Sequence, residues 1–215
     1  WDLPLCISNS VEEDRINAVQ NVKNVIHVAN NLGCHLISSH LWGFNGHQPE
    51  YNKQRCIKSL AKSISELSPL LGKKEVRLAF MPHPGGLLEE SNAAVDLIKE
   101  LGSKEVGYIY GTAHGSIMAQ PRQTQSDMIR YASDTLLHVS ISDSPDQWRI
   151  VAPPEVKAHE HSSIGSGDVN FREVITSLKD SGYKDHLSLH LISEIDRIDK
   201  AATDSRKVLQ ELLAE

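Results

Sequence analysis

The chain has 215 residues, which is enough for one large domain with a sizeable core. Hydrophobic residues make up 40% of it and charged residues 23%, a composition that excludes a mainly disordered chain. No window reaches the roughly 18 uninterrupted apolar residues of a membrane helix, and the formal net charge of −6 disfavours binding to nucleic acid. We therefore expect a small-molecule partner, with no nucleic acid and no membrane.

The spacing of apolar residues predicts helices and strands that alternate along the chain. Apolar residues recur at helical spacing in six segments and run more continuously in five short ones, with glycine or proline at most boundaries. In chain order the pattern predicts helix 11–32, strand 35–40, helix 53–71, strand 76–81, helix 88–101, strand 105–110, helix 125–134, strand 136–141, helix 170–181, strand 186–191 and helix 195–213. Ser10 and Glu13 have the spacing of a capping box for the first helix, Gly72 is the expected end of the second, and Gly111 to His114 are expected to form a loop.

Strict strand–helix alternation indicates a parallel sheet covered by helices, either doubly wound or a (β/α)8 barrel. A dinucleotide-binding sheet needs a Gly-x-Gly-x-x-Gly turn directly after a strand, and no predicted strand is followed by one. The barrel is therefore favoured, because the polar residues described next lie where a barrel carries its chemistry.

Residues able to bind a ligand or move a proton lie at the carboxyl end of every predicted strand. They are His40 and Trp42 at the first strand, His83 at the second, His114 at the third, Ser140 and Asp143 at the fourth and His190 at the fifth. Histidine can bind a metal or move a proton near neutral pH, so the recurrence predicts one histidine-lined site. The alternative is that each histidine is an ordinary hydrogen-bonded residue of a polar loop.

Three cysteines and the first 30 residues indicate the compartment. Cys6, Cys34 and Cys56 are an odd number without Cys-x-x-Cys spacing, which predicts reduced, buried thiols. Residues 1–30 lack the basic start, apolar block and cleavage site of a signal peptide. The expected location is the cytoplasm.

Several stretches match one family in its own order. The most specific are His161-Ser-Ser-Ile-Gly-Ser-Gly-Asp-Val-Asn-Phe171, Leu178-Lys-Asp-Ser-Gly-Tyr183 and Leu187-Ser-Leu-His-Leu191, and weaker ones are Ala29-Asn-Asn-Leu-Gly33, Leu78-Ala-Phe-Met-Pro-His-Pro-Gly85 and Gly107-Tyr-Ile-Tyr-Gly-Thr-Ala-His114. Together they resemble the sugar phosphate isomerase/epimerase family, the xylose isomerase-like TIM barrel group. The resemblance implies an α/β fold of parallel (β/α) units over a single partial domain, residues 1–215. It begins after the family's third strand, so that five of eight strands have a counterpart here.

The resemblance also implies a divalent metal held by Glu, Asp, His and Glu. At those positions this chain has Met81, Gly111, Ser140 and His190, although the histidine of the family's Asp-x-x-His motif is kept as His114. These replacements do not supply the oxygen ligands that a hard cation such as Mn²⁺ prefers. The sequence therefore leaves the metal ligands and the cofactor unknown, with an imidazole site for Zn²⁺ or Ni²⁺ as an open alternative.

By resemblance, the expected function is carbohydrate isomerisation or epimerisation by proton transfer next to a carbonyl. The candidate catalytic residues are His190 as base, His114 as donor to the sugar oxygens and Asp143 to orient a histidine; the candidate substrate-binding residues are His40, Trp42, His83, Ser140 and His161. The expected partner is a small carbohydrate, and a homo-oligomer is left open because five strands cannot close an eight-strand barrel.

Other functions remain as alternatives. One is a catalytically degenerate, metal-free member that binds a sugar-like ligand or serves as a subunit of an assembly. The abasic-site endonuclease branch is weaker, because the metal ligands are replaced and the net charge is −6.

Three smaller features each have a functional and an ordinary interpretation. Gly165-Ser-Gly167 either cradles a phosphate or makes a tight turn before a helix capped by Asp168 or Asn170. His159 and His161 are either paired metal ligands or part of a solvated loop. Trp42 with Phe44 either stacks on a sugar or anchors its loop.

Overall fold

The computed structural model describes residues 6–40, 52–83, 86–118, 123–144 and 160–215. Contacts divide the chain into two compact units. The first unit contains residues 1–89 and 93–108, and the second contains residues 90–92 and 109–215. The prediction of a single domain over residues 1–215 stays a prediction.

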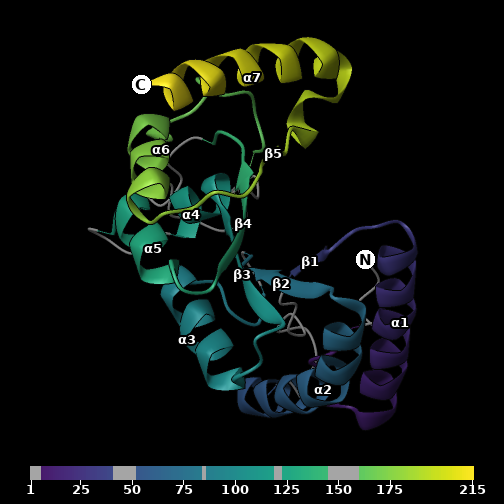
Figure 1. Ribbon diagram of the computed structural model, residues 1–215. Coiled ribbons are helices and arrows are strands. Elements are labelled where there is room, and N and C mark those ends of the chain that lie inside the picture. The colour runs from purple at the N-terminus through teal and green to yellow at the C-terminus, as the bar shows by residue number, and fades with distance from the viewer. Residues whose placement is uncertain (1–5, 41–51, 84–85, 119–122, 145–159) are drawn as a thin grey trace. The chain divides into compact units, whose positions relative to one another are not determined.

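Every predicted helix and strand is present in the predicted order, and one short helix after the third strand is additional. The elements are α1 Glu12–Asn31, β1 Leu36–His40, α2 Lys53–Lys74, β2 Arg77–Met81, α3 Ser91–Leu101, β3 Val106–Gly111, α4 Thr112–Met118, α5 Gln125–Ala132, β4 Leu136–Ile141, α6 Phe171–Asp180, β5 Leu187–Leu189, the 3-10 helix η3 Ile192–Arg197 and α7 Ile198–Ala214 (Figure 1). The strand order in the sheet, β1-β2-β3-β4-β5, follows the chain. The predicted α/β class of parallel strand–helix units is confirmed. Among the described helices, none offers the apolar length that a membrane crossing requires.

In the first unit, β1 pairs with β2 from Leu36↔Arg77 to His40↔Met81, so both strands end together. The helices α1 and α2 of this unit pack against each other (Figure 1). The guanidinium of Arg15, buried on α1, donates to Ser63 Oγ at 3.0 Å on α2. Burying a charged group is costly unless it is paired, and ion pairs with Glu12 and Glu66 supply the compensation. The remaining α2 face is apolar and buried: Cys56, Leu60, Ile64, Leu67 and Leu71.

Two helix boundaries differ from the sequence prediction. The capping box of Ser10 and Glu13 is wrong, because the N-cap residue of α1 is Val11, whose N–H donates to the Asn9 side chain at 2.9 Å. The predicted end of the second helix at Gly72 is also wrong. The helix α2 continues to Lys74 and ends at Glu75, which adopts the left-handed conformation at φ +54°.

In the second unit, β4 and β5 pair from Val139↔Leu187 to Ile141↔Leu189. Alternation separates two faces of these strands. Val139 and Ile141 are completely buried, whereas the other face of β4 carries polar residues. Those polar residues are His138, Ser140 and, directly after the strand, Ser142. The side chain of His138 contacts Ser188 Oγ of β5 at 2.8 Å, which places polar residues of both strands on this face.

Two further predictions are corrected here. Gly111 to His114 do not form a loop, because α4 begins at Thr112 directly after β3 and places His114 in its first turn. The prediction of buried thiols is wrong for Cys34, which is exposed, and holds for Cys56.

Candidate functional site

Three of the predicted histidines meet in the second unit. His114 lies on α4 directly after β3, His161 lies in the segment between β4 and α6, and His190 follows β5 directly. The His161 and His190 rings are stacked, with centroids 4.0 Å apart and an interplanar angle of 29°. The His114 ring meets His161 edge-on at 5.1 Å. We call these three residues the histidine row.

Ser142 fixes the middle member of the histidine row. Its Oγ lies 2.8 Å from Nδ1 of His161, and both side chains are buried. The backbone of Ser142 is itself held on both sides by Thr112, whose Oγ1 accepts from the Ser142 N–H at 3.0 Å and donates to the Ser142 carbonyl at 2.6 Å. A partner at one ring nitrogen selects the tautomer and the orientation of an imidazole. Sequence reasoning missed Ser142, although its spacing of two residues from Ser140 places both on one strand face.

Asp143 holds the segment that carries His161. The carboxylate is completely buried, and Oδ1 accepts the backbone N–H groups of Ser144 at 2.9 Å and Val169 at 3.1 Å. Oδ2 accepts the N–H of Gly165 at 2.8 Å. The backbone groups of Asp143 and Ser162 also exchange two hydrogen bonds, each of 3.0 Å. The carboxylate therefore acts on the loop backbone, and it makes no hydrogen bond to a histidine of the described residues.

The same hydrogen bonds decide between the interpretations of Gly165-Ser-Gly167. Gly165 adopts φ +89° while its N–H bonds to the Asp143 carboxylate. Gly167 approaches Ser144 so closely that a Cβ would lie 2.5 Å from its carbonyl carbon and oxygen. Asn170 caps α6 with its side chain. The tight turn with Asn170 as cap is the interpretation that the structure supports.

The 3-10 helix η3, which follows β5, holds the backbone of this segment from the other side. The His161 N–H donates to Ser193 Oγ at 2.9 Å, and the Ser193 N–H returns a bond of 3.2 Å to the His161 carbonyl. Glu194 Oε1 accepts both the N–H and the hydroxyl of Ser163 at 2.9 Å. The N–H of Ser163 is the main reason why the pKa of Glu194 lies below its ordinary value. These contacts link residues about 30 positions apart, and no local sequence pattern indicates them.

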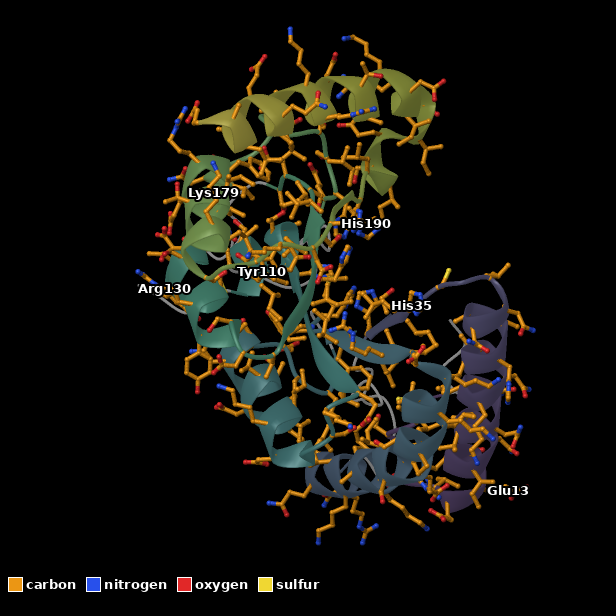
Figure 2. All side chains as sticks on the ribbon, viewed as in Figure 1. Glu13, His35, Tyr110, Arg130, Lys179 and His190 are labelled. Atoms are coloured by element: carbon orange, nitrogen blue, oxygen red, sulfur yellow. The ribbon has the colours of Figure 1, made fainter. Side chains whose placement is uncertain are left out.

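His190 is the accessible end of the histidine row. Its side chain is half-buried, in contrast to His114 and His161, which are buried (Figure 2). Its backbone N–H donates to the Ile141 carbonyl at 2.9 Å, so β4 fixes its position. Burial lowers the pKa of His190 below its ordinary value of 6.5, because the charged form loses hydration. The imidazole is therefore neutral near pH 7 and can accept a proton.

The other predicted site residues are not part of the histidine row. Ser140 is buried on β4, opposite Ser188 in the register. In the first unit, the rings of His40 and His83 meet edge-on, with centroids 4.8 Å apart. Trp42 lies outside the described residues. The structure thus forms two histidine groups, one in each unit.

The donor atoms of the described residues do not fit the metal that the resemblance implied. Imidazole lone pairs lie in the ring plane and must converge on an ion about 2 Å away, whereas stacked rings direct them side by side. Nδ1 of His161 is also taken by Ser142. Within the described residues, no group of three or more His, Cys, Asp or Glu side chains is arranged to hold a metal ion. His159, the suggested second ligand beside His161, lies outside them.

Comparisons with known proteins agree with this fold. A family model described as a xylose isomerase-like TIM barrel matches residues 4–212. An uncharacterized protein of Methanocaldococcus jannaschii, MJ1311, is 23% identical over 208 residues, which are 94% of this chain and 64% of that protein. The chain thus spans slightly less than two thirds of this curated relative.

Two solved structures are similar over nearly the whole chain. A D-tagatose 3-epimerase-like protein has a TM-score of 0.78 at 19% identity and covers 97% of this chain and 73% of its own. The D-psicose 3-epimerase of Clostridium cellulolyticum H10, solved with D-tagatose, has a TM-score of 0.78 at 17% identity and covers 99% and 76%. At these identities the likeness shows the fold, which is that of an incomplete barrel with five of eight strands.

Proposed function

Because the chain belongs to the xylose isomerase-like TIM barrel family, we propose that it is a sugar isomerase or epimerase homologue in which His190 moves the proton. The observation that carries the proposal is a neutral, half-buried imidazole at the carboxyl end of β5, held by β4 and stacked on His161. The carboxyl ends of the strands are where barrels of this kind carry their chemistry.

The reaction requires a base next to an activated carbonyl. For isomerisation, a ring nitrogen of the neutral His190 takes the proton from the hydroxyl-bearing carbon beside the carbonyl, and the C–H electron pair forms the enediolate. The hydroxyl proton passes to the former carbonyl oxygen while the imidazolium returns its proton to the former carbonyl carbon. Epimerisation at one carbon instead requires a second proton donor on the opposite face of the enediolate. A general base must be unprotonated to accept a proton, and the lowered pKa of the half-buried His190 favours its neutral form. No step is assigned to a metal ion, because the donor atoms do not fit one.

Other residues of the second unit support His190 in this proposal. The hydroxyl of Ser140, on the same strand face as Ser142, is the proposed donor to the enediolate oxygen. His161 and Ser142 limit the motion of His190 through the ring stack, and Asp143 positions His161 through the loop backbone. His114 as a further donor, and His40, Trp42 and His83 as sugar-binding residues, stay predictions.

The second candidate is a member that binds a sugar-like ligand without turning it over. The observation that favours it is the replacement of all four metal-ligand positions together with the burial of His114 and His161. A buried imidazole contributes to packing and does not reach a ligand without rearrangement.

Hydrogen exchange from ketohexoses separates the candidates. The protein is incubated in D₂O with D-tagatose, D-psicose or D-fructose, and loss of the proton beside the carbonyl is followed by NMR. We expect exchange that survives a chelator, is at least 100-fold slower in His190→Gln and is unchanged in His186→Gln, which replaces an exposed histidine before β5. Saturable binding without exchange would favour the second candidate. Equal exchange in His190→Gln would overturn the role of His190, and neither binding nor exchange would overturn the carbohydrate proposal.

A further inference from the structure

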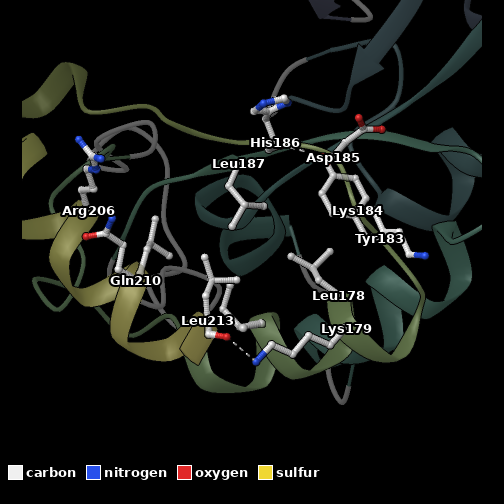
Figure 3. A pocket seen from close by; sticks show the side chains of 12 residues that line it. Leu178, Lys179, Tyr183, Lys184, Asp185, His186, Leu187, Arg206, Gln210 and Leu213 are labelled. Carbon is white, nitrogen blue, oxygen red and sulfur yellow. Dashed lines mark hydrogen bonds between the residues drawn. The ribbon is translucent and has the colours of Figure 1, made fainter. Parts of the chain in front are cut away.

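A hollow of about 440 Å³ lies in the second unit between α6, α7 and the start of β5 (Figure 3). It lies at the amino end of β5, whereas His190 lies beyond the carboxyl end of that strand. The volume falls in the range of pockets that hold small organic ligands. The hollow is therefore separate from the proposed reaction site.

The inner wall of the hollow is aliphatic. Five side chains from three elements form it: Ile175, Leu178, Leu187, Leu209 and Leu213. The labelled leucines among them point into the hollow in Figure 3. Leu213 leaves 48% of its surface exposed. The wall thus offers apolar surface to an occupant.

The rim of the hollow is cationic. Arg206 and Lys184 lie on opposite sides of it, with Lys179 between α6 and α7 (Figure 3). Within the described residues, neither Arg206 nor Lys184 has a hydrogen-bond or ion-pair partner, and Asp185 is the single carboxylate among the lining residues. Two cations without partners beside an aliphatic wall stand out in a chain of net charge −6. A guanidinium can hold a carboxylate through two parallel hydrogen bonds.

Contacts between α6 and α7 keep the hollow formed. Lys179 Nζ donates to the Leu213 carbonyl at 3.0 Å, and Arg172 of α6 forms an ion pair with Glu215 at the end of α7. On the β5 side, the Tyr183 hydroxyl donates to the His186 carbonyl at 2.8 Å and fixes the turn that leads into the strand. A preformed pocket binds its ligand without the cost of ordering its walls.

From this arrangement we infer that the hollow is a binding site for a monocarboxylate with an extended apolar chain. The apolar chain of the ligand lies on the leucine wall, and its carboxylate binds Arg206. A polar sugar does not suit the wall, and an uncharged hydrocarbon leaves the cations without a counter-charge.

Decanoate is the probe for this site, titrated into the whole protein labelled at its leucine and isoleucine methyl groups for NMR. We expect saturable shifts centred on the methyl groups of Leu187, Leu209 and Leu213, and at least tenfold weaker binding of butyrate and of 1-decanol. Arg206→Gln should weaken decanoate binding about tenfold or more. Lys207→Gln removes the same charge from the next residue of α7, which does not line the hollow, and should change the affinity less than twofold.

Several outcomes would overturn the inference. Shifts centred elsewhere, or no saturation at millimolar decanoate, would show that the hollow is no carboxylate site. Equal losses of decanoate affinity in Arg206→Gln and Lys207→Gln would show that only the net charge of the protein matters. Equal affinity for 1-decanol and decanoate would show that the cations do not contribute to binding. A dimer that decanoate dissociates, measured by light scattering, would show that a second copy covers the hollow instead.

Discussion

Replacing Asp143 tests whether this carboxylate organises the segment between β4 and α6. In Asp143→Ala, the N–H groups of Ser144, Gly165 and Val169 lose their acceptor. Ser144 and Val169 are buried, so each unsatisfied N–H costs about 1–3 kcal/mol, whereas Gly165 is exposed and can bond to water. The expected loss in free energy of unfolding is therefore about 4 kcal/mol.

The variant Asp143→Asn separates the two carboxylate oxygens. Its carbonyl keeps the two bonds at the Oδ1 position, but its amide group faces the N–H of Gly165, so that one bond is lost. Because the Gly165 N–H is exposed and can bond to water, the expected cost is about 1 kcal/mol or less, well below that of the alanine variant. Asp134→Ala removes an exposed aspartate from the turn before β4 and should stay within about 0.5 kcal/mol of the wild type.

Urea unfolding followed by circular dichroism gives the free energies, and hydrogen exchange locates the effect. We expect Gly165 to lose amide protection in both variants and Val169 to lose it only in Asp143→Ala. A cost below about 1 kcal/mol for the alanine variant would refute the reasoning, since it would mean that the three N–H groups find other acceptors. Equal costs for alanine and asparagine would refute the division between the two oxygens.

Three further predictions concern a close approach and two titrating groups. Gly167→Ala should destabilise the protein by about 1–3 kcal/mol, because the new Cβ would meet rigid backbone at 2.5 Å. Gly72→Ala should be neutral or stabilising by up to about 1 kcal/mol in denaturant unfolding, since alanine favours the helix and only the mobile tip of Glu105 lies near. The lowered pKa of Glu194 contributes stability that is present above its ordinary pKa of 4.5 and lost as the pH falls toward the folded-state value, so Glu194→Gln should flatten the acid limb of the unfolding curve. If His190 is the base, ketohexose exchange should fall only as the pH drops below 6.5, because its pKa is lowered in the folded protein.

For each of these predictions, the opposite result would show which assumption is wrong. Equal stabilities of Gly167→Ala and Gly72→Ala would show that the loop can relax around a methyl group. An unchanged acid limb in Glu194→Gln would mean that its bonds to Ser163 contribute little. An exchange midpoint above pH 6.5 would assign the base to another group.

Two helix boundaries could not be predicted from the sequence, because each depends on the geometry of one residue. Ser10 and Glu13 have the spacing of a capping box, but α1 begins one residue later and Asn9 bonds to Val11 instead. Gly72 resembles a helix end, yet α2 buries Leu71 and continues until Glu75 takes the left-handed conformation. Local composition offers several acceptable ends, and packing selects among them.

The candidate site could be predicted in part. The residues after each strand indicate His114 and His190, because parallel strands place their carboxyl ends at one edge. His161 is suggested by the family resemblance. The ring stack, and the hydrogen bond of Ser142 to His161, join residues 19 to 29 positions apart and depend on how the loop returns. The sequence suggests that Asp143 orients a histidine. In the structure, its carboxylate oxygens instead accept hydrogen bonds from backbone N–H groups of the loop.

The sequence by itself determined the order of strands and helices and the parallel α/β class, because hydrophobic periodicity acts within each segment. Through the family resemblance, it also indicates that the usual metal-ligand positions carry other residue types. Only the tertiary structure decided which polar side chains meet: His161 lies on His190, Asp143 binds the loop, and Arg206 borders an aliphatic hollow. The physical reason is that these contacts form between distant segments whose register and loop path are set by packing of the whole unit.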